Sequence, residues 1–222
     1  MGKPVQTDGG NALQSDTASS LLPTRRLADD FLKNFWRYTH PLYPIVHQGT
    51  ITNAYHVLWL SSSDKTQMTP VPFSESRVFW ATLNVIFAMG CQFSDHVEVS
   101  QRVSLANEFY NRSQSISSSF VLEAATVESV QLLLLTSIYL QSTQHASRCW
   151  NTLGLAIRAA QAVGLHRDAE CSTLLDREIG RRIWHNCVVL DRSCWPLFQD
   201  LHPLTSVYYL DYNQCVLDAQ QC

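Results

Sequence analysis

Charged residues are scarce in this sequence. Only 16% of the 222 residues are Asp, Glu, Lys or Arg, against roughly 25% in typical globular domains, so much of the chain is expected to be covered. The net charge is −3, whereas domains that grip a nucleic-acid backbone usually have a basic excess. The hydrophobic content of 45% is typical of a globular protein. The slightly negative net charge gives no support to a surface that binds nucleic acid.

Long apolar runs and paired cysteines are also missing. The longest dense apolar run, VQLLLLTSIYL at residues 130–140, is far shorter than the roughly 20 residues that a membrane span needs. The N-terminus lacks the apolar stretch of a signal peptide. The seven cysteines form no CxxC and no Cys/His pair at the short spacing of a zinc knuckle. These features predict a soluble intracellular protein with no membrane partner and with reduced, mostly buried thiols.

The sequence contains one fragment of a catalytic motif. His166-Arg167-Asp168 spells the start of the protein-kinase catalytic loop, but Thr173 stands where that loop needs an Asn. GxGxxG and DFG, which a kinase also needs, do not occur, and neither do GxSxG, HExxH or a Walker loop. Gly164 instead predicts the end of a helix, where a cationic His166 or Arg167 would suit the negative end of the helix dipole.

Two other polar groups invite a functional reading. Asp29-Asp30 is similar to the magnesium-binding pair of terpene cyclases, but Lys33 occupies the place of their next aspartate, so we expect a solvated pair at a helix start. His40 and His47 flank a proline-rich turn without a Cys or carboxylate at ligand spacing, so we expect ordinary polar positions. We predict no catalytic, cofactor-binding or metal-binding residue, and no enzyme.

Apolar spacing predicts helices along most of the chain. In residues 25–40 one stripe contains Leu27, Phe31, Phe35 and Tyr38, and prolines end this helix before an extended segment at 40–47. Further helical patterns cover 50–60, 75–94, 99–116, 126–143, 148–164 and 176–195. The 75–94 segment is apolar nearly all round, which predicts burial on most faces. With no strand pattern, the fold class is all-α, with stacked helical hairpins.

Local signals refine these helices and their surroundings. Thr126 is a predicted N-cap with Ser129 at the capping-box position. We expect the tryptophans to lie in the core with bonded N–H groups, except Trp195, which we expect to be exposed. Residues 1–24 have the composition of a disordered tail, and residues 196–222 form a divergent C-terminal tail. The tryptophans are Trp36, Trp59, Trp80, Trp150, Trp184 and Trp195.

Two segments near the C-terminus carry an ordered set of Trp, Gly, Arg and His residues. They are CWNTLGLAIRAAQAVGLHRD at 149–168 and DREIGRRIWHNCVVLDR at 176–192. Together they resemble the regulatory middle homology domain of fungal zinc-cluster (Zn2Cys6) transcription factors. Upstream, residues 22–47 look like the entry to that domain, so the resemblance spans about 22–195. The matched residues are Trp150, Gly154, Ala156, Arg158, Ala160, Gly164, Leu165, His166, Glu178, Arg181, Arg182, Trp184, Leu190, Asp191 and Arg192.

The sequence also departs from the family pattern. His185 stands where the family has a second tryptophan, and the Gly-Arg-Pro turn that follows Leu-Asp-Arg in the family does not occur. The six-cysteine zinc cluster, through which the family binds DNA, is absent from the sequence, so we expect no cofactor in this chain. We therefore expect an incomplete helical regulatory domain at 25–195, from a truncated product or a gene model read through an intron boundary. Its loss of later helices would expose Ile183, Val188 or Leu190 and favour aggregation.

The resemblance implies nuclear localisation and control of transcription by RNA polymerase II. The implied mechanism is restraint: helices that pack on other regions of a full-length regulator or on a transcriptional partner protein, or that hold a small-molecule inducer. The alternative is a stand-alone helical interaction module, a decoy of a full-length relative or a non-functional truncated product. Arg181 and Arg182 could contact DNA phosphates or a partner, but structural pairing with Glu178, Asp191 or carbonyl groups is favoured. The other family-motif residues are likewise read as structural.

Overall fold

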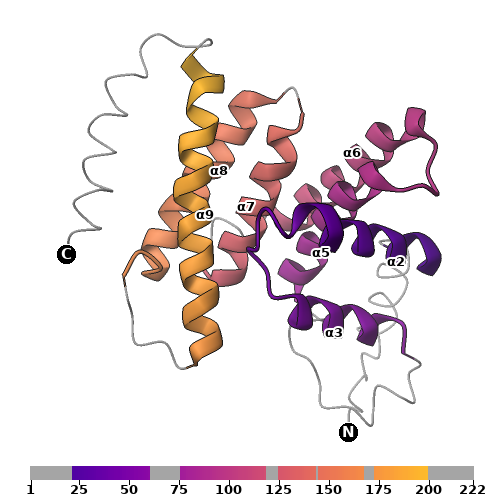
Figure 1. The fold of residues 1–222 in the computed structure, drawn as a ribbon, viewed down its shortest axis with the longest axis horizontal. Helices are drawn as coiled ribbons and strands as arrows, with labels where there is room; N and C mark the ends of the chain where they lie inside the picture. Colours follow the sequence, from indigo (N-terminus) through magenta and orange to yellow (C-terminus); the bar gives the residue numbers. More distant parts are fainter. Residues whose placement is uncertain (1–21, 61–75, 119–124, 144, 168–172, 200–222) are drawn as a thin grey trace, which may run out of the picture.

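The computed structural model describes residues 22–60, 76–118, 125–143, 145–167 and 173–199, with side chains as far as Cys194. All regular structure in these ranges is helical, which confirms the all-α prediction (Figure 1). The helices are α2 (Arg25–Asn34), α3 (Gln48–Leu58), α5 (Arg77–Gly90), α6 (Val99–Ser117), α7 (Val127–Gln141), α8 (Ala146–Val163) and α9 (Leu174–Gln199), with a π-helical turn at Phe35–Thr39 and a 3-10 turn at Cys91–Phe93.

Helices that follow one another in the chain pack side by side. The most extensive contacts join α5 to α6, α7 to α8, and α8 to α9, which confirms the stacked hairpins. Contacts between α5 and α7 join these hairpins, and α2 packs on α5. Figure 1 shows α9 at one side of the bundle and α2, α3 and α6 at the other. None of the helices in the described ranges combines the length and the apolarity that a membrane crossing requires.

The centre of the bundle is formed by α5 and α7, the two most apolar helices. Residues 81–90 of α5 are all buried, as the apolar pattern of this segment predicted. At its end α5 meets α2 so closely that a Cβ on Gly90 would lie 1.9 Å from the carbonyl oxygen of Phe31. Only glycine allows two backbones to approach to this distance, so Gly90 sets the spacing of α2 and α5.

Several helix starts are capped by side chains. The predicted capping box of α7 forms: Ser129 N–H donates to Thr126 Oγ1 at 3.1 Å, and Thr126 N–H donates to Ser129 Oγ at 2.8 Å. Ser76 caps α5 by accepting from Phe79 N–H at 3.3 Å. These bonds satisfy backbone donors that a helix leaves without an intrahelical partner.

The predicted stripe of the first helix is wrong at Tyr38. The chain forms a π turn at 35–39, where His40 N–H donates to the Phe35 carbonyl at 3.0 Å. A π turn holds one residue more than an α turn, so the residues after it change face, and Tyr38 is 42% exposed whereas Phe31 and Phe35 are fully buried. The predicted extended segment 40–47 begins as a turn over three residues and then follows no regular structure.

The two predicted tails lie largely outside the described residues. Leu22, the first described residue, packs against the core just before α2. The domain boundaries at 24 and 195 remain predictions.

Candidate functional site

The α8–α9 hairpin carries all the residues of the family motif. Gly164 ends α8 in the left-handed conformation, at φ 84°, as its sequence position predicted. Its N–H donates to the Gln161 carbonyl at 3.0 Å, and Leu165 N–H donates to the Ala160 carbonyl at 3.0 Å. This termination turns the chain sharply, so that the next two side chains, Leu165 and His166, face α9.

Leu165 and His166 join the two helices. A Cβ on Gly180 would lie 3.5 Å from Leu165 Cδ2, so the leucine packs where α9 has no side chain. The His166 ring lies 5.8 Å from the Trp184 ring, measured between centroids. The exit from α8 and the first half of α9 therefore touch through motif residues of both segments. We call this contact region, Leu165 and His166 against Gly180 and Trp184, the α8–α9 seam.

The His166 ring has one bonded and one unbonded nitrogen. Arg167 Nε donates to His166 Nε2 at 3.0 Å, which requires this nitrogen to be unprotonated. Nδ1 is buried with no hydrogen-bond partner in the described ranges. His166 contributes an aromatic face to the seam.

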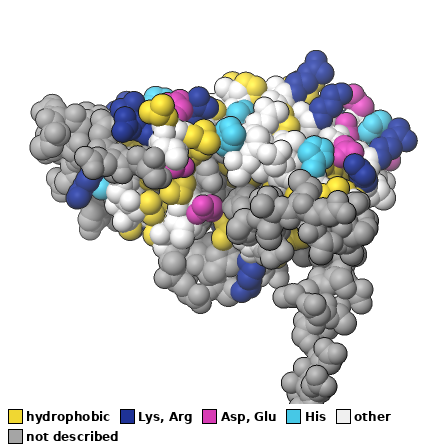
Figure 2. All heavy atoms as spheres, turned by 90° about the horizontal axis from the view of Figure 1, so that it is seen from below, with side chains coloured by type: hydrophobic (Ala, Val, Ile, Leu, Met, Phe, Trp, Pro, Cys, Tyr) yellow, Lys and Arg dark blue, Asp and Glu magenta, His cyan; other side chains and the backbone are white. Residues whose placement is uncertain are grey.

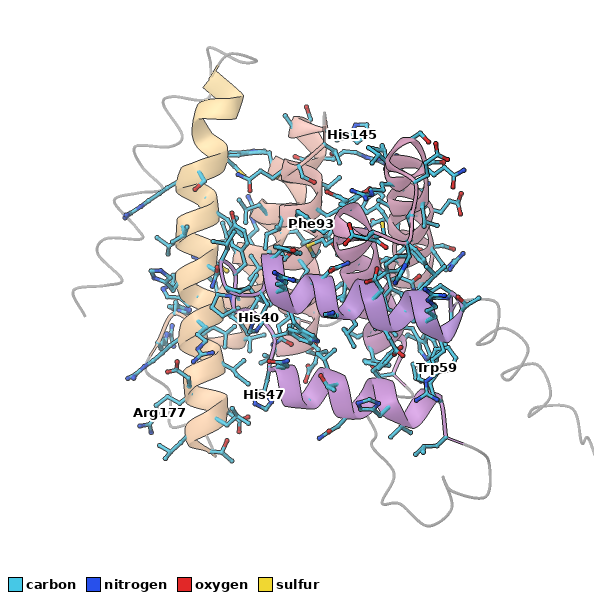
Figure 3. All side chains as sticks on the ribbon, turned by 45° about the vertical axis from the view of Figure 1, so that its right-hand side comes forward. His40, His47, Trp59, Phe93, His145 and Arg177 are labelled. Carbon is cyan, nitrogen blue, oxygen red and sulfur yellow. The ribbon has the colours of Figure 1, made fainter. Side chains whose placement is uncertain are left out.

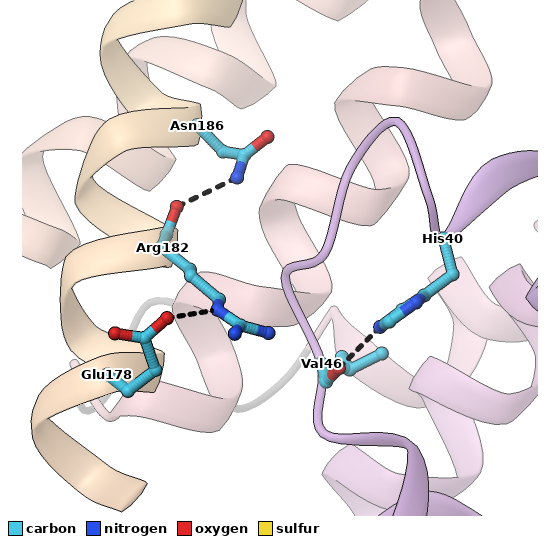
Figure 4. A network of polar contacts seen from close by, with 5 residues as sticks. All are labelled: His40, Val46, Glu178, Arg182 and Asn186. Atoms are coloured by element: carbon cyan, nitrogen blue, oxygen red, sulfur yellow. Dashed lines mark hydrogen bonds and ion pairs between the residues drawn. The ribbon is translucent and has the colours of Figure 1, made fainter. Parts of the chain in front are cut away.

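The charged motif residues in the first half of α9, Glu178, Arg181 and Arg182, lie on its exposed side. Arg182 Nε donates to Glu178 Oε1 at 2.7 Å, which is the predicted pair of residues four apart. Asn186 Nδ2 donates to the Arg182 carbonyl at 2.8 Å (Figure 4). Arg181 is exposed, and Arg177 points away from the other helices (Figure 3). The observed Arg182 bonds match the structural reading of this residue.

The face drawn in Figure 2 does not show one continuous basic surface. Its Lys and Arg side chains gather in separate groups that are interspersed with acidic side chains and histidines. Backbone phosphates bind where positive charge is concentrated along a groove or helix. On this face the described residues offer no such path.

The remaining motif residues are less closely connected. Gly154 is not a site of close helix approach, because the nearest atom to a Cβ there would be Arg158 Nη1 at 3.1 Å, and Arg158 itself donates to the Gly154 carbonyl at 3.0 Å. Trp150 is half-buried and Arg192 is exposed. Burial raises the pKa of the Asp191 carboxyl to about 6, although nearby Arg192 opposes this shift.

The expectation for Ile183, Val188 and Leu190 was wrong. Ile183 and Leu190 are 0% and 1% exposed, and Val188 is half-buried. The reason is that α7 and α8, which precede α9 in the chain, cover this face. Among the side chains of α9 that the structure describes, the exposed apolar ones are instead Leu174, Leu175 and Val189.

The tryptophans fit the core prediction only in part. Trp36, Trp59 and Trp184 pack against the core while remaining half-buried. Buried Nε1–H groups of Trp36 and Trp59 have no partner in the described ranges, contrary to the expectation of bonded N–H groups. The Trp36 ring packs against the rings of Phe35 and His40, whose centroids are both 4.9 Å from its own. These aromatic contacts take the place of a hydrogen-bond acceptor for the indole N–H. Trp195 lies outside the described side chains.

The prediction of a solvated acidic pair at a helix start was wrong about the position, whereas the Asp29 side chain is 53% exposed and Asp30 is half-buried. Asp29 and Asp30 lie in the middle of α2, where Tyr55 O–H donates to Asp29 Oδ1 at 2.5 Å. Ser94 O–H donates to Asp30 Oδ2 at 2.5 Å, and Asn34 donates to the same oxygen at 3.3 Å. The pair therefore ties α2 to α3 and to the turn before α6. Helix periodicity alone could not show these partners.

The two histidines near the proline-rich turn hold local structure. His40 Nε2 lies 2.9 Å from the Val46 carbonyl oxygen, closing the turn (Figures 3 and 4). His47 is the N-cap of α3 and accepts from Thr50 N–H at 3.2 Å. Across the ranges that the structure describes, no group of three or more His, Cys, Asp or Glu side chains could hold a metal ion.

One close contact was missed at the sequence level. Cys149 of α8 and Cys194 of α9 are both buried, with their Sγ atoms 3.5 Å apart. The cysteine count and the apolar faces of both helices were visible in the sequence. The contact between the two cysteines depends on how the two antiparallel helices align. Residue spacing along the chain does not reveal this alignment.

Comparison with known proteins identifies the family. The sequence profile described as "Fungal specific transcription factor domain" matches residues 32–198. The chain belongs to this family. The resemblance seen in the motif residues is thereby confirmed, and the fungal transcription factor domain of this chain includes the whole α8–α9 seam.

The relatives are named as transcription factors or regulators. The chain is 30% identical over 190 residues to "Sorbicillinoid biosynthetic cluster transcription factor 2" of Penicillium rubens, covering 82% of this chain and 26% of that protein. It is 28% identical over 189 residues to "Transcription factor FBD3" of Gibberella moniliformis, covering 83% and 24%. It is 24% identical over 166 residues to "Lactose regulatory protein LAC9" of Kluyveromyces lactis, covering 75% and 17%.

The chain thus spans about a quarter or less of the length of these curated relatives. No solved structure gives a significant match to the chain.

Proposed function

We propose that this domain acts in the nucleus by restraint, controlling whether a fungal regulator activates transcription by RNA polymerase II. The single observation that carries the proposal is the α8–α9 seam, where family-motif residues hold two helices together. A motif that fixes how two helices pack suits a domain whose helix arrangement is recognised by a neighbouring protein or protein region. Restraint then requires two arrangements of the domain that a ligand or partner binds with different affinity.

The proposed partners are other regions of a full-length regulator or a transcriptional partner protein, with a small-molecule inducer as the ligand that shifts the balance. DNA would be contacted through a zinc cluster outside the residues of this domain. Zinc would belong to that cluster, and we propose no cofactor for the domain itself.

A non-enzymatic role is supported by the contacts of the side chains that could suggest catalysis. Asp29 and Asp30 bind Tyr55 and Ser94, and the His166 ring lies tilted beside the Trp184 ring. Each of these groups is engaged in holding helices together. The charged motif residues Arg158 and Arg182 are bonded within their own helices.

A reporter assay tests the restraint. The full chain is placed between a heterologous DNA-binding domain and an activation domain in yeast, and reporter output is compared with a fusion lacking the chain. We expect several-fold lower output with the chain present, and recovery of output when His166 and Trp184 are both changed to alanine. Gln101→Ala on the exposed side of α6 is the matched control and should leave the restraint intact. Equal reporter output with and without the chain, at equal protein levels, would overturn the proposal.

DNA binding is tested separately. We expect the 222-residue chain alone to give no sequence-specific complex with a short palindromic duplex in a gel-shift assay. A sub-micromolar complex that survives competition by unrelated DNA would contradict the assignment of DNA contact to a separate zinc cluster.

A second candidate is a stand-alone interaction module that competes with an intact relative. The observation in its favour is the apolar exposure at the start of α9, where Leu174 is 81% exposed and Leu175 is 46% exposed. Expression of the chain as a separate protein beside an intact zinc-cluster regulator discriminates the two. Co-purification together with reduced activation would favour the module, and activation unchanged by the separate chain would reject it.

A further inference from the structure

Two buried thiols face each other between the last two helices. Cys149 lies in the first turn of α8 and Cys194 lies near the end of α9, so the antiparallel hairpin brings them together. Their Sγ atoms are 3.5 Å apart, and each residue is 3% exposed. Among the four described cysteines this pair is in sulfur contact, whereas Cys91 and Cys187 are buried free thiols.

The hydrogen bonds around the pair give the two sulfurs different roles. Cys149 S–H donates to the Ser137 carbonyl oxygen of α7 at 3.3 Å. Because this bond uses the Cys149 proton, Cys194 must be the donor in the contact between the two sulfurs. The bond from Cys194 lowers the pKa of the Cys149 thiol, while burial opposes this shift. The same bond raises the pKa of Cys194, and burial adds to the increase.

The other described thiols lack this arrangement. Burial, with a smaller contribution from nearby Asp191, raises the pKa of Cys187 to about 12. Burial likewise raises the pKa of Cys91 to about 12, and Cys91 donates to the Ala88 carbonyl at 3.4 Å. Since the thiolate is the reactive form of cysteine, both are poorer nucleophiles than Cys149.

We propose that Cys149 and Cys194 are a site of oxidative modification, in which a peroxide converts the two thiols into a disulfide that joins α8 to α9. This inference does not depend on the proposed function. The oxidant must be small, because each residue is only 3% exposed and a bulky reagent would not reach the sulfurs. A disulfide has an S–S length near 2.05 Å, so the sulfurs need to approach by about 1.5 Å.

The chemistry balances with hydrogen peroxide as the oxidant. The Cys149 thiolate attacks one peroxide oxygen, the O–O bond breaks, and the departing hydroxide takes a proton to give water. The Cys149 sulfenic acid so formed is attacked by the Cys194 sulfur, the S–O bond breaks, and a second water leaves with the Cys194 proton. Two thiols are oxidised, one peroxide is reduced, and one S–S bond forms.

The disulfide would close a loop that contains most of α8, the seam and most of α9. With the disulfide in place, the end of α9 could no longer move away from the start of α8 independently of the rest of the closed loop. Such a bond restricts the unfolded chain more strongly as the loop becomes longer. The oxidised protein should therefore resist opening of α9.

Peptide mapping tests the site in the full 222-residue chain. The folded protein is treated with one equivalent of hydrogen peroxide, free thiols are blocked by alkylation, and the protein is cleaved with trypsin and chymotrypsin. Cleavage after Arg192 and Phe198 separates Cys194 from Cys215 and Cys222. We expect the main cross-linked peptide to join Cys149 to Cys194, with two hydrogens fewer than the reduced pair.

Variants and a thermal melt complete the test. Cys149→Ser and Cys194→Ser should each abolish this peptide, and Cys187→Ser, a buried thiol on the same helix, should leave it in place. The oxidised wild-type chain and the oxidised Cys187→Ser chain should melt at a higher temperature than their reduced forms. Other cysteine pairs as the main products, or only unlinked oxidised thiols in the folded chain, would overturn the proposal. So would a pairing pattern identical to that of the chain oxidised in guanidinium chloride.

Discussion

The centre of the bundle and the α8–α9 seam are built in different ways. At the centre, Phe87 of the nearly all-apolar helix α5 meets Phe31 of α2 and Phe109 of α6 edge to face, with centroid separations among the three rings of 5.6 to 6.2 Å. At the seam, the contacts are few and individually shaped: one leucine over Gly180 and one histidine ring beside Trp184. The centre relies on buried area, whereas the seam relies on the fit of particular residues.

This difference explains where the family motif lies. Many apolar combinations can fill a core of adequate volume, so the centre leaves no short signature. A helix end in the left-handed conformation and a close helix crossing each accept few residue types. The motif residue Gly164 occupies the first kind of position, at φ 84°, and for that reason the family can be recognised there.

The largest expected effect is at the α2–α5 crossing in the centre. Gly90→Ala would place a Cβ 1.9 Å from a backbone oxygen of Phe31, and we expect the free energy of unfolding to fall by about 4 kcal/mol or more. Gly154→Ala is the control, because its nearest neighbour is the flexible end of Arg158 at 3.1 Å. It should be neutral or add up to about 1 kcal/mol through helix propensity. Urea unfolding measures the free energy of unfolding of both variants. Equal stability of the two variants would contradict the close approach of α2 and α5 at Gly90.

The next effect separates the two regions directly. Leu190→Ala removes a side chain that is 1% exposed in α9, and we expect a loss of about 2–4 kcal/mol. Because α9 packs chiefly on α8 and α7 at one side of the bundle, the loss should appear as faster amide hydrogen exchange in α9. Exchange in α5 should change much less. Uniform acceleration in both helices would show that the regions open together.

A smaller effect depends on pH. Burial raises the pKa of the Asp191 carboxyl to about 6, well above the ordinary range of an aspartate, so the folded state binds a proton more tightly than the unfolded state. This contribution to stability is present below about pH 4 and is lost as pH rises through about 6. Asp191→Asn should therefore raise stability at pH 7 by about 1–2 kcal/mol, allowing for solvent screening, and leave it nearly unchanged at pH 4.

Thermal melts at the two pH values measure this difference. Asp95→Asn, at an exposed position before α6, is the control and should change stability little at either pH. An Asp191→Asn effect of equal size at pH 4 and pH 7 would contradict the raised pKa.

The smallest effect is on the exposed face of α9. Glu178→Gln weakens the 2.7 Å pair with Arg182, whose side chains are 52% and 47% exposed. We expect a loss of about 0.2–0.5 kcal/mol that disappears in high salt. A double-mutant cycle with Arg182→Gln measures the pair, and a coupling above about 1 kcal/mol would mean that it does more than an ordinary surface pair.

Local interactions account for what the sequence could predict. The capping box of Thr126 and Ser129 and the left-handed Gly164 each involve residues within a few positions of one another. Helix ends and the buried helix α5 were predictable for this reason. The same holds for the Glu178–Arg182 pair, which is four residues apart on one helix.

The contacts that were missed or misread join distant segments. Tyr55 lies 26 positions from Asp29, Ser94 lies 64 positions from Asp30, and Cys194 lies 45 positions from Cys149. Each depends on how helices cross, which follows from packing of the whole bundle. The acidic pair looked like a solvated helix start because its partners belong to other elements.

The π turn at 35–39 has a consequence for comparing related chains. It holds one residue more than an α-helical turn would. Deleting one residue there would let the helix continue regularly, and the preceding segment would turn by about 100° around its axis. Ala28 and Phe31, now 0% exposed, would then leave the core. A relative one residue shorter at this place therefore needs its apolar residues at shifted positions upstream, and a single-residue gap in an alignment here records a rotation of the helix.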